Sequence, residues 1–99
     1  MGAEYTGNAL GTFEIDSLVS CYVALDVAAK TANIKIKSVE RNRLGCEVCA
    51  KIQGNISDVN AAMDAIIEVT KTYGKLLAWN IIPAPGDGVV EVMQMTVSD

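Results

Sequence analysis

Apolar residues along positions 9–83 recur at spacings that switch between those of strands and those of helices. The run Ala9–Ile15 predicts a first strand. Helical spacing follows at Leu18, Cys21, Tyr22, Leu25, Ala28 or Ala29, and Ala32. This spacing predicts a helix over residues 17–31. Asp16 stands just before it and is the predicted N-cap, because a carboxylate can accept hydrogen bonds from the exposed amides of a first helical turn.

Two further strands are predicted in the middle of the chain. Ile34–Val39 begins by alternating apolar and polar residues, as a half-buried strand does. Val48–Ile52 alternates in the same way and predicts a third strand, which closes at Gly54. Between these strands, Arg41–Gly45 is polar and contains asparagine and glycine, which favours a hairpin-like connection.

A second helix and a last strand complete the pattern. Ser57 is the predicted cap of a helix with apolar positions at Val59, Ala62, Met63, Ile66, Val69, Thr70 and Tyr73. Gly74 follows where a left-handed C-terminal cap is expected. The run Leu76–Ile82 is almost wholly apolar and predicts a strand buried on both faces. Pro83 and Pro85 end it, and residues 86–99 form either a short helix or an added strand.

The predicted order is β-α-β-β-α-β, which is typical of the ferredoxin-like arrangement. This is an α+β fold, an α/β sandwich in which both helices cover one face of an antiparallel sheet. The length of 99 residues indicates one domain. We expect an N-terminal arm over residues 1–8, a domain over 9–86 and a C-terminal extension over 87–99.

The composition of the chain argues against several classes of function. The formal net charge of -4 does not suit a generic nucleic-acid binder. No apolar run approaches the roughly 20 residues of a membrane span, and the first residues do not resemble a signal peptide. We therefore expect a cytoplasmic protein without nucleic-acid or membrane partners, and with reduced cysteines. Histidine, the commonest general base and metal ligand, is absent, so we expect no enzymatic activity.

The chain carries a Cys-x-x-Cys spacing at Cys46 and Cys49. Side chains alternate between faces along a strand, so residues three apart diverge and cannot bind one ion together. We expect Cys49 on the helix-free face of the sheet and Cys21 in the core. Cys46, beside Gly45 at the border of loop and strand, is the thiol with most freedom.

The charged residues give no catalytic pair by their spacing alone. We interpret Glu40, Glu47 and Asp58 as solvated carboxylates. Asp26 and Lys30 are four residues apart in the favourable order for a helix ion pair, and a cation suits the end of a helix.

Several motifs together resemble the single-domain shell proteins of bacterial microcompartments. They are Ala9-Leu-Gly11, Asp26-x-x-x-Lys30-x-Ala32-Asn33, the Gly54 turn into the second helix, and Ile81-Ile-Pro-Ala-Pro85. The resemblance covers residues 8–86 and is more specific than any single motif.

The resemblance implies cyclic homohexamers that tile into the facets of a shell around encapsulated enzymes. It implies a central pore lined by Arg41, Asn42, Arg43, Leu44, Gly45 and Cys46. It also implies hexamer-edge contacts at Lys30, Asn33 and Ala84. The family has an arginine where this chain has Ala84. Partners would be other copies, other shell proteins and the enzymes inside.

Sixfold repetition would concentrate the arginines of the loop, and a focused positive field raises the local concentration of counter-ions. We therefore expect small polar or anionic metabolites to cross the pore. Some members of the family hold an iron–sulfur cluster at the pore through a loop cysteine, and the resemblance suggests a [4Fe–4S] cluster at Cys46. Glu47 follows here, where the clearest cluster-binding loops have proline.

Two other functions fit the predicted fold. One is a ferredoxin-like regulatory module that binds a small ligand, and the other is a small iron–sulfur electron carrier. A hexamer that forms sheets favours the shell protein, whereas a soluble dimer favours the regulatory module.

Overall fold

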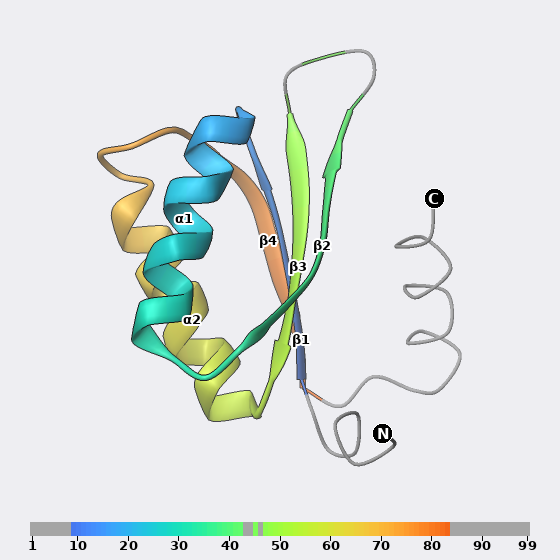
Figure 1. The fold of residues 1–99 in the computed structure, drawn as a ribbon, viewed down its shortest axis with the longest axis vertical. Coiled ribbons are helices and arrows are strands. Elements are labelled where there is room, and N and C mark those ends of the chain that lie inside the picture. The colour runs from blue at the N-terminus through green and yellow to red at the C-terminus, as the bar shows by residue number, and fades with distance from the viewer. Residues whose placement is uncertain (1–8, 43–44, 46, 84–99) are drawn as a thin grey trace.

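The computed structural model of the chain describes residues 9–42, 45 and 47–83 (Figure 1). The predicted N-terminal arm and C-terminal extension lie outside these residues. The elements are β1 Ala9–Ile15, α1 Leu18–Thr31, β2 Lys35–Arg41, β3 Val48–Gly54, α2 Ile56–Val69 and β4 Leu76–Ile82. This is the predicted order, with β2 beginning one residue later and ending two residues later than the alternation suggested.

The strands form one antiparallel sheet in the order β2-β3-β1-β4. Both helices lie on one face of it (Figure 1), which confirms the predicted α+β fold. The other face, which no described helix covers, is the open face (Figure 1). The order leaves β2 and β4 at the two edges, and the turn between β2 and β3 lies at one end of the sheet.

The core lies between the sheet and the two helices. Alternation along β1 directs Ala9, Phe13 and Ile15 toward the helices, where all three are buried. Cys21 on α1 is fully buried among them, as predicted. Gly11 allows close contact between layers, because a Cβ atom there would lie 3.0 Å from side-chain carbons of both Ile52 and Val59.

The predicted cap of α1 was wrong by one residue. Ser17 is the N-cap, and its hydroxyl accepts a hydrogen bond from the Ser20 amide at 3.2 Å. Asp16 has another role, because its carboxylate accepts from the Lys75 amide at 3.1 Å. The Asp16 amide also donates to the Lys75 carbonyl at 3.1 Å. Asp16 therefore joins the end of β1 to the start of β4.

Both predicted ends of α2 also change. Asn55 is the N-cap and makes no side-chain capping bond, while Ser57 lies in the first turn. The helix ends at Val69, so Tyr73 lies beyond it. Gly74 is left-handed with φ of 90°, as expected, but it closes the turn that follows the helix rather than capping the helix itself.

The prediction that β4 is buried on both faces was wrong. Leu77 is 44% exposed and Trp79 is 50% exposed. The cause is topological, since β4 pairs only with β1 among the described strands and lies at the edge of the sheet.

Candidate functional site

The predicted pore loop connects β2 to β3 at one end of the sheet. Arg41 is the last residue of β2 and pairs with Val48, so it belongs to the strand rather than to the loop. The Asn42 amide donates to the Glu47 carbonyl at 2.9 Å and closes the base of the turn. Arg41, Asn42 and Gly45 are exposed. They therefore form an accessible surface where β2 enters the turn and within the turn itself.

Several predicted site residues fall outside the described part of the chain. They are Arg43, Leu44 and Cys46 of the loop, and Ala84 of the predicted hexamer edge. Within residues 9–42, 45 and 47–83, no three His, Cys, Asp or Glu side chains come together as a metal site would require.

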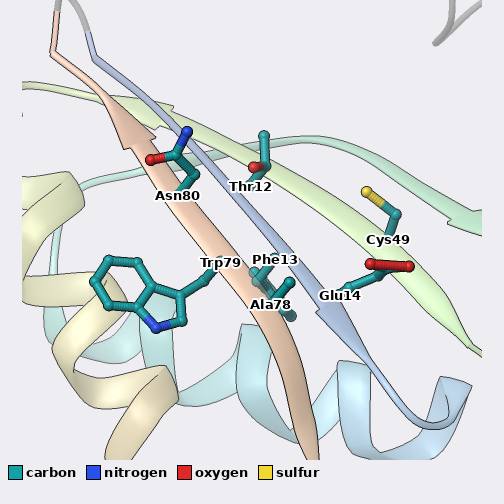
Figure 2. A pocket seen from close by; sticks show the side chains of 7 residues that line it. All are labelled: Thr12, Phe13, Glu14, Cys49, Ala78, Trp79 and Asn80. Atoms are coloured by element: carbon teal, nitrogen blue, oxygen red, sulfur yellow. The ribbon is translucent and has the colours of Figure 1, made fainter.

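Two hollows lie beside each other on the open face and share Glu14 and Cys49. The first has a volume of about 150 Å³ (Figure 2), and its lining includes Thr12, Glu14, Cys49, Ala78 and Asn80. The second has a volume of about 230 Å³. It lies at the base of the loop, between the two shared residues and Glu40, Arg41, Asn42, Glu47 and Val48.

Cys49 lies on the open face, as predicted, with its side chain beside that of Glu14 (Figure 2). Burial raises the pKa of the Cys49 thiol, Lys51 opposes this rise, and Glu40 and Glu14 add to it. The nearby ion pair, between Lys51 Nζ and Glu40 Oε1 at 3.2 Å, is partly buried. These surroundings hold Cys49 in its protonated form, which is a poor nucleophile and a poor metal ligand.

Cys21 is still less suited to thiol chemistry. Its burial in the core, with a smaller contribution from Cys49, raises the pKa of the Cys21 thiol to about 11. The thiolate is the reactive form of cysteine, so both described cysteines act as small packing residues.

The predicted edge residues lie at the far end of α1. Lys30 Nζ forms an ion pair with Asp26 Oδ2 at 2.9 Å, as their spacing predicted, and the Lys30 side chain is 75% exposed. Asn33 is exposed, and its amide donates to Asp58 Oδ1 at 3.4 Å. This contact ties the chain after α1 to the first turn of α2. Lys30 and Asn33 are therefore presented to solvent from a fixed corner of the domain.

The apolar edge strand β4 is a surface that the sequence interpretation missed. In Figure 2, Trp79 projects from β4 away from the side that carries Cys49. Leu77 lies where the β1–β4 register shifts, and it is also exposed. Exposed apolar side chains on an edge strand favour contact with another chain. The missed signal was topological, since the last strand of this fold lies at an edge.

The four-stranded antiparallel sheet with both helices on one face defines a small α+β domain (Figure 1). The BMC domain family matches residues 9–85. The chain therefore belongs to the BMC domain family.

Named relatives agree with this assignment. The chain is 35% identical to the carboxysome shell protein CcmK4 of Synechococcus elongatus over 86 residues, which is 85% of this chain and 75% of the relative. It is 29% identical to the microcompartment shell protein PduK of Citrobacter freundii over 82 residues. That match covers 83% of this chain and 53% of PduK. The chain is 30% identical to the carboxysome assembly protein CcmO of Synechococcus, covering 92% of this chain and 33% of the relative.

A solved structure supports the fold. It is the crystal structure of a microcompartment protein from Desulfitobacterium hafniense, which matches with a TM-score of 0.77 at 17% identity. The match covers 89% of this chain and 47% of that one. This chain thus spans about half the length of PduK and of the solved structure. Family membership supports a structural role in a microcompartment shell. No helix among the described residues is long and apolar enough to cross a membrane.

Proposed function

We propose that this protein is a structural shell component of a bacterial microcompartment in the cytoplasm and that it works as a cyclic homohexamer. The observation that carries the proposal is the BMC domain match over residues 9–85 on a matching fold. The role is architectural rather than catalytic. It also fits the absence of histidine from the sequence and the raised pKa of both described thiols.

The ring is built by repeating one heterologous contact, in which one surface of each copy meets a different surface of the next copy. The loop between β2 and β3 points to the centre, so the two sheet edges flank it and meet the neighbours. β4 offers Leu77 and Trp79 to this contact, and β2 offers Ile36, which is 46% exposed. Both edges therefore offer exposed apolar side chains to the contact between neighbouring copies.

The hexamers then tile side by side with other copies and with other shell proteins around the encapsulated enzymes. Lys30 and Asn33 lie at the outer edge in this arrangement, together with Ala84. Alanine at that last position removes the arginine contact that the resemblance implies, so Lys30 carries a larger share of the contact between hexamers.

Replacing Lys30 by alanine is expected to abolish the sheets while leaving the hexamers intact. The Asp26–Lys30 pair is exposed, so its loss should change the domain's stability by about 0.5 kcal/mol or less. Electron microscopy follows the sheets and sedimentation follows the hexamers. Lys71→Ala is the matched control, because Lys71, just beyond α2, also forms an exposed ion pair, at 3.1 Å with Glu68. Sheets that persist in Lys30→Ala and vanish in Lys71→Ala contradict the edge assignment.

The loop residues Arg41 to Cys46 surround the pore, and the pore passes small polar or anionic metabolites. Arg41 is exposed at the base of the hairpin. Arg43 is two residues further along, so six copies would place twelve arginines around one opening. Such a ring concentrates anions at the opening.

Replacing both Arg41 and Arg43 by serine is expected to slow the exit of a small carboxylate from assembled shells by about tenfold, because the local field is lost. Exit of a neutral solute of similar size should not change. A variant that loses two exposed lysines away from the loop, Lys71→Ser with Lys75→Ser, keeps the anion rate and controls for total charge. Equal anion exit rates in the arginine variant and the parent protein would show that the loop arginines do not concentrate anions at the pore.

Cys46 is the one thiol of the loop, and we propose it as a ligand of a pore [4Fe–4S] cluster. A single chain does not provide the four thiolates that such a cluster uses, so a site can form only where several copies meet. Anaerobically purified protein is expected to show a visible absorption band that Cys46→Ser removes and Cys49→Ser retains. Colourless, iron-free protein after reconstitution with iron and sulfide overturns the assignment.

A further inference from the structure

One end of the open face is buried although no described helix or strand lies over it (Figure 1). Leu10 on β1 and Gln53 on β3 face each other in register, and each is only 3% exposed. Alternation places both side chains on the open face, because their neighbours in β1 and β3 point into the core. When only one face of an antiparallel sheet packs on a core, the residues of the other face are normally exposed to solvent.

Two polar atoms at this end of the face lack both solvent and a partner. They are Gln53 Oε1 and Ser38 Oγ. Ser38 pairs with Lys51, two residues from Gln53 on β3, so both atoms lie on the same side of the sheet. Buried polar atoms nearly always have hydrogen-bond partners, and an orphaned pair therefore indicates that something carrying donors covers this end.

The burial of the open face is confined to this end. At the end near the loop, Glu14 is exposed, and Thr12 and Cys49 are only partly buried around the hollow. The buried end is where β4 finishes, because Ile82 pairs with Leu10. The chain therefore leaves the sheet beside the buried residues.

We propose that residues 86–99 dock on this end of the open face and cover Leu10, Gln53 and Ser38. This inference goes beyond the shell role and does not depend on it. The segment supplies apolar side chains for Leu10 and backbone amides for the two orphaned oxygens. Its apolar residues are Val89, Val90, Val92, Met93, Met95 and Val97.

The length and the charges of residues 86–99 are both compatible with docking on this face. The three strand spacings from β4 to β2 amount to about 14 Å, and fourteen residues span about 20 Å even as a helix. The segment carries Asp87, Glu91 and Asp99, whereas β2 carries Lys35 and Lys37. Residues 1–8 also adjoin this end of β1, but their sequence MGAEYTGN offers little apolar surface.

The test uses a thiol reporter beneath the proposed cover. In a chain with Cys46→Ser and Cys49→Ser, the substitution Gln53→Cys places the reporter, and N-ethylmaleimide modification is followed by mass spectrometry. Ending the chain after Pro85 is expected to speed modification by about tenfold or more, since a covered thiol reacts only when its cover opens. Glu68→Cys, exposed on α2, is the matched reporter and should react equally fast in both chains.

A point-substituted full chain separates docking from damage to the fold. Val90→Asp with Val92→Asp is expected to accelerate the Gln53→Cys reaction as truncation does, whereas Ser98→Asp is not. Cys21 stays unmodified if the core is intact. An unchanged rate after removal of residues 86–99 overturns the proposal. So does acceleration only on removal of residues 1–8, or acceleration of the full chain on dilution, which would identify a second copy as the cover.

Discussion

Replacing Trp79 by aspartate is expected to convert the proposed hexamer into monomers that remain folded. The Trp79 side chain lies on the edge strand β4 and is 50% exposed in the single chain, so we expect the interface rather than the core to lose a contact. Truncation of a buried aromatic anchor typically costs about 2–4 kcal/mol per interface. The buried charge adds to that cost. Sedimentation velocity measures the size, and circular dichroism checks the fold.

The neighbouring residue gives the control for this experiment. Asn80→Asp adds the same charge one position along β4, on the opposite face of the strand. Asn80 Oδ1 accepts a hydrogen bond from the Ile81 amide at 2.9 Å, and a carboxylate can keep that bond. The ring should therefore survive Asn80→Asp. A hexamer that tolerates Trp79→Asp and Leu77→Asp would show that the ring contact lies elsewhere.

Replacing Phe13 by alanine is expected to lower the free energy of unfolding by about 3–5 kcal/mol. Phe13 lies on the central strand β1, is 1% exposed and belongs to the core cluster between sheet and helices. A small domain is stable by about 5–15 kcal/mol in total, so this one change removes a large share. Urea unfolding at fixed protein concentration measures it, because assembly makes apparent stability depend on concentration.

Thr12→Ala is the matched control for the core experiment. Thr12 is the residue before Phe13 on the same strand, but its side chain lines the hollow on the open face. Its loss should change stability by about 0.5 kcal/mol or less, as surface changes usually do. Similar losses for Thr12→Ala and Phe13→Ala would mean that the sheet does not bury one face against the helices.

Local patterns were sufficient to predict the element order and the faces of the inner strands. Alternation correctly placed Cys49 on the open face, because β3 lies between two strands and follows a strict period of two. Helical spacing placed Cys21 in the core for a similar reason, since one side of α1 packs on the sheet.

Features that depend on distant partners were not predictable from local patterns. Asp16 has the chemistry of a cap, yet Lys75, which is remote in sequence, takes its carboxylate, and Ser17 caps the helix instead. The apolar run of β4 has the composition of a buried strand. Its exposure depends on sheet order and, in the proposed ring, on a neighbouring copy that covers Trp79.

Some features of the candidate site could likewise be predicted from local sequence, and others could not. The Asp26–Lys30 pair could be predicted, because helix geometry brings residues four apart together. The hollows around Glu14 and Cys49 could not, because strand register brings their linings together. The buried oxygen of Gln53 had no sequence signal, since the residue reads as an ordinary polar position of an alternating strand.

We expect six copies of this chain to close into a ring, and the mass of the native assembly tests this directly. Native mass spectrometry of the full chain at micromolar concentration is predicted to give a species six times the 10.5 kDa protomer. The same sample should show flat, sixfold particles in electron micrographs. A stable monomer or dimer, with the core intact by urea unfolding, would rule out the ring.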